Sequence, residues 1–278
     1  MPRGVLAFFF LVFLFSSPGA VASAETGGPE SRRDSGPRPE AGPSKVSIRP
    51  KHAAEAGGRG LQPDVSLIDT PTTSVLDYHG YATTARFFSS GGVLEHVSFG
   101  VFHRLNIGAS LNVDRLIGSD SSTRVRAPNV QAKYRFFDGD GWIPSAAVGF
   151  DGQGYLYDGT AKRYNHRHRG FFLVATQELF IPGLQAHPSV NISDFDSNSI
   201  YGAIPLSLNF RDWVCLMFEW DSVSDWSHSR INSGLRVYVT PGFHLDFGVR
   251  GIGQGGRFDD GAPRGPERVA QIRYSGNF

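Results

Sequence analysis

Apolar and polar residues alternate one by one through a series of segments near ten residues long. In one of them, Leu105, Ile107, Leu111 and Val113 alternate with polar or small residues such as Asn106 and Asn112. Successive side chains of a strand point to opposite faces, so each such segment predicts a strand with one apolar and one polar face. The clearest segments are 105–114, 129–136, 184–192, 214–221, 231–239 and 243–250.

Weaker alternation extends the series over most of the chain after residue 60. These segments are 80–88, 93–102, 142–151, 170–178, 200–210 and the last one, which ends at Phe278. Together they predict about twelve strands, each long enough to cross a bilayer when tilted. A soluble sandwich would also contain alternating strands, so the alternation alone leaves both folds open.

The lengths of the connections favour the membrane fold. Short links at 103–104, 138–141 and 211–212 alternate with long polar links at 115–127 and 152–168. This order is typical of an up-and-down antiparallel transmembrane β-barrel with short periplasmic turns and longer external loops. We therefore predict an all-β fold in which the first strand pairs with the last, since an open sheet edge in hydrocarbon leaves amides unpaired. An even strand number places both barrel termini in the periplasm.

The last strand carries a further signal. Ile272, Tyr274 and Phe278 share one face of it, and an aromatic C-terminus is typical of strands that the barrel-assembly machinery recognises. Aromatic residues near the other strand ends predict interfacial girdles. These are Phe87, Phe102, Phe137, Trp142, Phe150, Phe180, Phe210, Trp213, Trp220, Tyr238 and Phe243.

The amino-terminal part divides into two segments. Residues 1–24 are expected to be a signal peptide, with an apolar stretch from Val5 to Phe15 and a small-x-small cleavage site ending at Ala24. Residues 25–60 are rich in Gly, Pro, Ser and charged residues, which predicts a disordered periplasmic linker. The barrel is then assigned to residues 61–278, in the outer membrane.

The stretch before the first strand, residues 65–77, has scattered apolar residues and Pro71. We expect it to form a strap tucked into or under the mouth of the barrel.

Charge and cysteine content exclude several functions. With 27 basic and 26 acidic residues, the net charge of +1 gives no reason to expect a nucleic-acid partner. Cys215 is the single cysteine, so neither a disulfide framework nor a cysteine-rich metal site is expected. His166 and His168 lack a third ligand nearby in the sequence, and Ser227 beside His228 is more typical of a solvated loop than of a catalytic pair. We predict no metal, no cofactor and no enzymatic activity.

The polar faces are the better candidates for function. If the apolar faces contact lipid, a set of charged residues points into the lumen, because an Arg or Lys facing lipid at the midplane costs about 2 to 4 kcal/mol. Their mixed signs predict either salt bridges that fill the lumen or a narrow polar pore. The residues are Asp114, Lys133, Arg135, Asp151, Glu219, Asp221, Arg236, Asp246, Arg250 and Arg273.

Several motifs are similar to those of a known family. They are Leu67-Ile68-Asp69-Thr70-Pro71-Thr72, Arg86-Phe87-Phe88 with Gly91-Gly92, Pro144 to Gly149, and Asp151-Gly152-Gln153-Gly154. In these the chain resembles the YjbH-like outer-membrane proteins, which are linked to exopolysaccharide production. The resemblance implies a shortened, single-barrel relative with a role in polysaccharide secretion, and it carries no catalytic residues.

The sequence thus favours a non-enzymatic outer-membrane barrel for envelope transport or exopolysaccharide export. Its expected partners are outer-membrane lipid, the barrel-assembly machinery and a polysaccharide. Two alternatives stay open: an adhesin or structural envelope protein that binds through the loops 115–127, 152–168 and 252–266, and an outer-membrane hydrolase that uses His228 and a serine.

Overall fold

A computed structural model describes residues 60–118, 122–140, 142–154, 157–158, 163–164, 170–193, 200–223, 229–253 and 265–278. The expected signal peptide and all of the expected linker except Gly60 lie outside these ranges. Among the described residues, no helix is both long enough and apolar enough to cross a bilayer.

The described chain is almost entirely antiparallel sheet. Its elements are β1 (Gly80–Phe88), the 3-10 turn η1 (Ser89–Gly91), β2 (Gly92–Phe102), β3 (Leu105–Asp114), β4 (Arg124–Val125), β5 (Asn129–Phe137), β6 (Ser145–Asp151), β7 (Tyr157–Asp158), β8 (Arg163–Tyr164), β9 (Gly170–Glu178), β10 (Leu184–Ala186), β11 (Ser189–Ser193), β12 (Ile200–Phe210), β13 (Val214–Asp221), β14 (Arg230–Thr240), β15 (Phe243–Ile252) and β16 (Glu267–Asn277).

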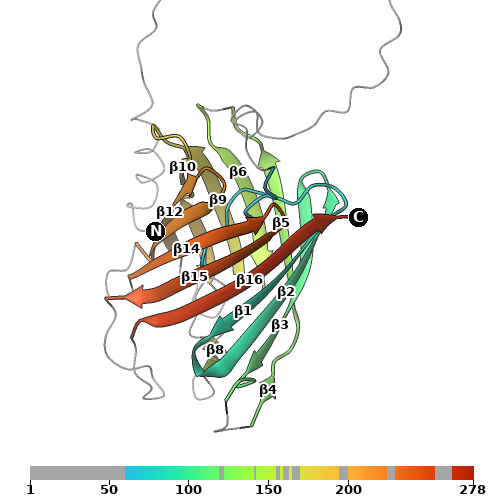
Figure 1. Cartoon of the computed structure of the whole chain (residues 1–278), viewed down its shortest axis with the longest axis vertical. Coiled ribbons are helices and arrows are strands. Elements are labelled where there is room, and N and C mark those ends of the chain that lie inside the picture. The colour runs from blue at the N-terminus through green and yellow to red at the C-terminus, as the bar shows by residue number, and fades with distance from the viewer. Residues whose placement is uncertain are drawn as a thin grey trace, which may run out of the picture. The chain divides into compact units, whose positions relative to one another are not determined.

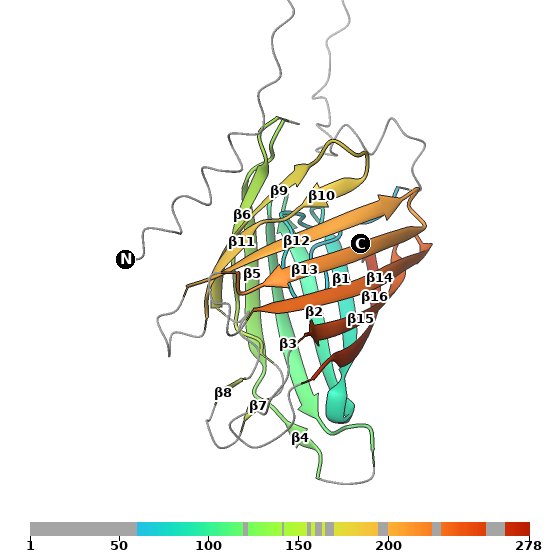
Figure 2. The same ribbon diagram turned by 90° about the vertical axis from the view of Figure 1, so that its left-hand side faces the viewer.

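The main sheet closes on itself (Figures 1 and 2). Neighbouring strands pair in the order β1, β2, β3, β5, β6, β9, the two pieces β10 and β11, β12, β13, β14, β15 and β16. The last strand, β16, then pairs with β1, from Gly80 opposite Asn277 to Phe87 opposite Ala270. Counting β10 and β11 as one broken strand, the described residues form a closed barrel of twelve strands. The predicted all-β, twelve-strand antiparallel barrel is confirmed.

One predicted strand is divided in two. The alternation predicted a continuous strand over 184–192, but β10 ends at Ala186 and β11 begins at Ser189. Pro188 lies in the gap and has no N–H to donate to the sheet. Its carbonyl still accepts a hydrogen bond from the amide of Ala175 at 3.0 Å, so both pieces occupy the same place beside β9.

The two rims of the barrel differ as the connection lengths predicted. The terminal rim, where Gly80 lies opposite Asn277, carries short turns such as 103–104 and 241–242. The opposite rim, called the loop rim, carries the links 115–128 and 253–266 and, as its short exception, η1. The first and last barrel strands thus begin and end at the same rim, as an even strand number requires.

The outer wall of the barrel is apolar. Exposed large side chains occupy alternate positions of neighbouring strands, as the face assignment predicted. Among them are Ile107 and Leu111 of β3, Val130 and Tyr134 of β5, Phe171 and Leu173 of β9, Leu216 and Phe218 of β13, Phe247 and Val249 of β15, and Ile272 and Tyr274 of β16.

Two residues depart from this simple division. Tyr238 was predicted to lie in an aromatic girdle, but it is 2% exposed and lies inside. It shares the inward face of β14 with Arg236, and its hydroxyl donates to the carboxylate of Asp64. Glu95 of β2 is a charged residue on the outer face, because its neighbours Leu94 and His96 face inward. Its carboxylate accepts a hydrogen bond from the Thr83 hydroxyl at 2.5 Å.

A hairpin of the chain occupies the inside of the barrel. We call residues 62–77 the inserted hairpin; it is the blue segment within the barrel in Figures 1 and 2. It enters at the terminal rim, where the amide of Gln62 donates to Pro241, and reverses at a turn in which the amide of Leu67 donates to Thr70. It then returns to β1.

The hairpin packs into a surface shaped for it. Leu67 and Ile68 form an apolar cluster with Cys215, Met217 and Tyr238 of the inner wall. A Cβ added at Gly234 would lie 2.9 Å from the Cδ1 atom of Ile68, so a larger residue there would displace the hairpin. The predicted strap at 65–77 falls within this segment.

Candidate functional site

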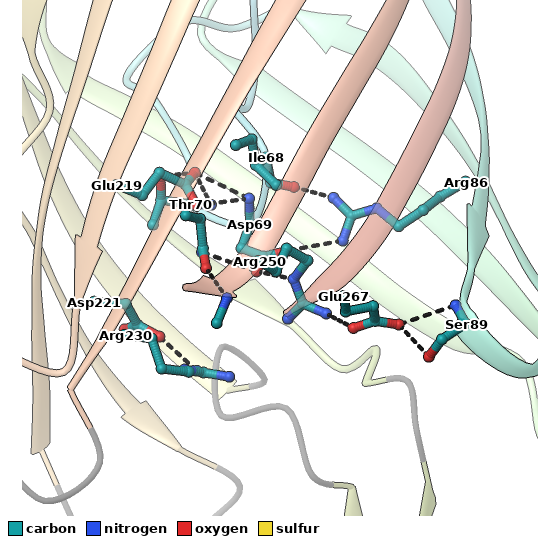
Figure 3. A network of polar contacts seen from close by, with 12 residues as sticks. Ile68, Asp69, Thr70, Arg86, Ser89, Glu219, Asp221, Arg230, Arg250 and Glu267 are labelled. Carbon is teal, nitrogen blue, oxygen red and sulfur yellow. Dashed lines mark hydrogen bonds and ion pairs between the residues drawn. The ribbon is translucent and has the colours of Figure 1, made fainter. Parts of the chain in front are cut away.

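The tip of the inserted hairpin is held by a buried carboxylate. The side chain of Asp69 is 0% exposed and lies between two arginines of the inner wall (Figure 3). Its Oδ1 atom is 3.0 Å from Nη1 of Arg86, and its Oδ2 atom is 2.5 Å from Nε of Arg250. Asn232 also donates to Oδ2 at 3.2 Å. Strands β1, β14 and β15 thus converge on one hairpin residue.

A second carboxylate, from the wall, binds the backbone of the same turn. Glu219 of β13 is 0% exposed and accepts hydrogen bonds from the amides of Asp69 at 2.9 Å and Thr70 at 3.0 Å. The Thr70 hydroxyl donates to it at 2.7 Å and Asn232 at 2.9 Å. Hydrogen bonds to an ionised acceptor are about twice as strong as neutral ones, and here they compensate for burying the charge.

The incoming arm of the hairpin is held nearer the terminal rim. Arg236 binds Asp246 through two hydrogen bonds of 2.8 Å, and its Nη1 atom lies 2.7 Å from the carboxylate of Asp64. It also donates to the carbonyl of Ser66 at 3.0 Å. An arginine bound on both sides in this way connects the β14–β15 wall to the hairpin.

The ammonium group of Lys133 connects the two arms. It donates to the carbonyl of Val65 at 2.7 Å on the incoming arm and to that of Thr72 at 3.1 Å on the returning arm. In the described part of the chain, no carboxylate forms an ion pair with it.

The returning arm contacts a chain of hydroxyl and imidazole groups. The amide of Thr73 donates to the hydroxyl of Thr176, which is 2.9 Å from Nδ1 of His187. Nε2 of His187 is in turn 2.9 Å from the hydroxyl of Ser207. A serine beside a histidine is a possible nucleophile and base. Here a threonine occupies the place of the orienting carboxylate, and neither residue lines the lumen cavity described below, so the contacts are those of a packing network.

The ten predicted lumen residues all lie on inward-facing positions. Glu219, Asp221, Arg236, Asp246, Arg250, Arg273 and Lys133 are buried, and Asp114, Arg135 and Asp151 are half-buried. The structure pairs Arg250 with Glu267 as well as Asp69. Further ion pairs of these residues join Asp221 with Arg230, Asp114 with Arg126, Arg135 with Asp138, and Arg236 with Asp246 and Asp64.

The predicted assembly-signal residues lie on the outer wall. Ile272, Tyr274 and Phe278 are 41%, 49% and 83% exposed. The ring of Phe278 lies against Tyr81 of β1, with centroids 4.8 Å apart, and against Phe99 of β2. The last residue therefore covers the seam where the barrel closes.

The candidate catalytic and metal residues fall elsewhere. His166, His168, Ser227 and His228 lie outside the described residues. Within the described ranges, no group of three or more His, Cys, Asp or Glu side chains is placed to hold a metal ion.

A small cavity with both polar and apolar lining lies beside the hairpin. Its volume is about 160 Å³, and its lining comes from the hairpin and from β1, β2, β3, β5, β6, β9, β11 and β16. The hairpin supplies Val65, Ser66, Ile68, Asp69 and Pro71 to this lining.

Comparisons with known proteins assign no family. No family model matches the chain, and no curated protein does. Among solved structures, a mutant of the Rh. blastica porin aligns over 66% of this chain at 9% identity with a TM-score of 0.33. This chain covers 55% of that porin's length. The N-terminal β-barrel domain of Pseudomonas aeruginosa OprF aligns over 72% of this chain and 96% of that domain, at 8% identity and a TM-score of 0.21. These likenesses are slight, and the fold rests on the strand pairing described above.

We expect Glu219→Gln to loosen the hairpin tip. The amide that replaces one carboxylate oxygen cannot accept hydrogen bonds, so Asp69, Thr70 and Asn232 lose part of a charged acceptor. The residues 60–79 contain no Lys or Arg but include Asp64, Asp69 and Asp77, so endoproteinase Asp-N is a suitable probe. Mass spectrometry should find cleavage before Asp69 at least about tenfold faster than in the wild type.

The matched control is Glu95→Gln, which removes a carboxylate that does not contact the hairpin. Equal cleavage rates in Glu219→Gln and the wild type would show that the tip does not depend on this carboxylate.

Proposed function

We propose that this chain is a non-enzymatic β-barrel of the bacterial outer membrane that acts in envelope transport. The apolar outer wall and closed strand edges support the membrane placement, because a spanning sheet must satisfy its backbone and present apolar side chains to lipid. Orientation follows from the rims: the terminal rim would face the periplasm, where barrel turns are short.

The observation that carries the transport proposal is the inserted hairpin. A barrel that served only as a scaffold could fill its lumen with side chains of its own strands. Here a separate segment fills it and is held largely by ion pairs and hydrogen bonds, through Asp69, Glu219, Arg236 and Lys133. Such groups are readily hydrated, which offsets the exposure of the buried apolar side chains Leu67, Ile68, Val75 and Leu76 when the hairpin withdraws into water. The hairpin is therefore suited to a closing element that can be displaced.

The cargo is proposed from the sequence resemblance. Similarity of the motif Leu67 to Thr72 to YjbH-like proteins supports exopolysaccharide export, with the polysaccharide and the barrel-assembly machinery as partners. In the structure this motif forms the tip of the inserted hairpin. A sugar chain could pass only after the hairpin moved.

The adhesin alternative depends on the loop 115–127, most of which is described, and on the loops 152–168 and 252–266, which lie largely outside the described residues. The hydrolase alternative depends on His228, which lies outside them. No observation in the described ranges favours either one, so transport remains the proposal.

Membrane placement predicts a depth-dependent cost of charge on the outer wall. Phe247 is 53% exposed in the middle of β15, and Ile252 is 39% exposed at the end of the same strand. In lipid vesicles, Phe247→Arg should lower the free energy of unfolding by about 2 to 4 kcal/mol, and Ile252→Arg by about 0 to 1 kcal/mol. Urea titration measures both. Equal effects of the two substitutions would argue against a bilayer around this wall.

Displacement of the hairpin should open the lumen. In planar bilayers, the wild type should stay closed for most of the recording. The double variant Asp69→Asn/Glu219→Gln weakens both sides of the tip attachment and should raise the fraction of time in conducting states by at least roughly tenfold.

Glu95→Gln, which leaves the hairpin contacts intact, should behave as the wild type does. A double variant whose hairpin is cleaved rapidly by protease, and which nevertheless never conducts, would contradict the transport role and leave a structural one.

A further inference from the structure

Two buried cations of the lumen differ from all the others described there. Arg273 of β16 is 3% exposed, its Nε atom has no hydrogen-bond acceptor, and no ion pair reaches it within the described ranges. Lys133 of β5 is 8% exposed and binds hairpin carbonyls rather than a carboxylate. Both side chains line the cavity beside the hairpin, close enough for their charges to repel.

Other lumen arginines have carboxylate partners. Arg86 and Arg250 bind Asp69, Arg236 binds Asp246, and Arg230 binds Asp221. The carboxylates whose charges reach Arg273, those of Asp64 and Asp246, are already bound to Arg236. An unpaired buried charge is costly, so a cavity that contains two of them favours an anionic occupant.

The remaining lining suits an oxyanion. Gln271 and Ser98 offer an amide and a hydroxyl donor around the cavity, and the amide nitrogen of Gln131 is hydrogen-bonded to His96. Asp69, the hairpin carboxylate at the edge, is neutralised by two arginines. Asp151 is the second lining carboxylate, and it accepts a hydrogen bond from the amide of Gln153 at 2.9 Å. A volume of about 160 Å³ holds a group of the size of phosphate or a sugar carboxylate together with a few waters.

We propose that Arg273 and Lys133 form a binding site for a small oxyanion, a phosphate or the carboxylate of an acidic sugar, in the cavity beside the inserted hairpin. The guanidinium of Arg273 supplies a planar pair of donors, and the ammonium of Lys133 supplies a point charge. This site does not depend on the transport role, because a permanently closed barrel would present the same cavity.

The test is isothermal titration calorimetry on the folded full chain in detergent at low ionic strength. Inorganic phosphate and glucuronate are titrated separately, so the two arms distinguish the two sources of the oxyanion. At least one of them should bind saturably at one site. Arg273→Gln and Lys133→Gln should each weaken that binding by at least about tenfold, because each removes a charge-assisted hydrogen bond.

The matched control is Arg104→Gln, which removes a cation paired with Asp138 at the terminal rim, outside the cavity. It should bind as tightly as the wild type. Arg273→Lys retains the charge and replaces Arg273→Gln if the latter does not fold; it should weaken binding less than Lys133→Gln does. Absence of saturable binding of both anions, unchanged affinity in the cavity variants, or an equal loss in Arg104→Gln would overturn the proposal.

Discussion

Closure of the sheet is the constraint from which the rest of the structure follows. Because β16 pairs with β1, every strand residue faces one of two walls, and the outer wall takes the apolar set. Most charged side chains of the strands are then confined to the inside, where they need partners. Part of that need is met between strands, as in Arg236 with Asp246, and part by the inserted hairpin, which brings Asp69 to Arg86 and Arg250.

The hairpin and the wall compensate for each other's buried polar groups. Glu219 has no cation in the described part of the chain, and its charge is balanced by amides of the turn that it binds. Without Glu219, these amides of the turn would be left unpaired inside the lumen. Removal of either partner therefore costs more than the loss of one contact, and this mutual dependence gives the closed state its specificity.

The sequence predicted the strands well because a period of two is a local signal. The number of strands and the inward direction of residues such as Lys133 and Arg273 follow from the alternation along the chain, and the difference between the rims follows from the lengths of the connections. The same alternation explains why the prediction for Tyr238 was wrong. Its aromatic character indicated the outer wall, but it lies two residues after Arg236 and therefore shares the inward face of β14. The break at Pro188 could have been predicted from its missing N–H.

The contacts of the hairpin could not be predicted in the same way. Asp69 and Arg250 are separated by 181 residues, and no periodic pattern connects them. A weak signal was present, since Cys215 and Met217 are apolar at inward positions and therefore require an apolar partner inside. That signal indicates an occupant without saying which segment supplies it.

The central claim is that the turn at residues 67–70 lies inside the barrel and is bound by Glu219. Hydrogen exchange of the backbone amides of Asp69 and Thr70, measured on the protein in lipid vesicles, tests this most directly. The account predicts exchange slowed by orders of magnitude, comparable with the amides of β1. Exchange of these two amides at the rate of an unstructured peptide, while β1 remained protected, would contradict it.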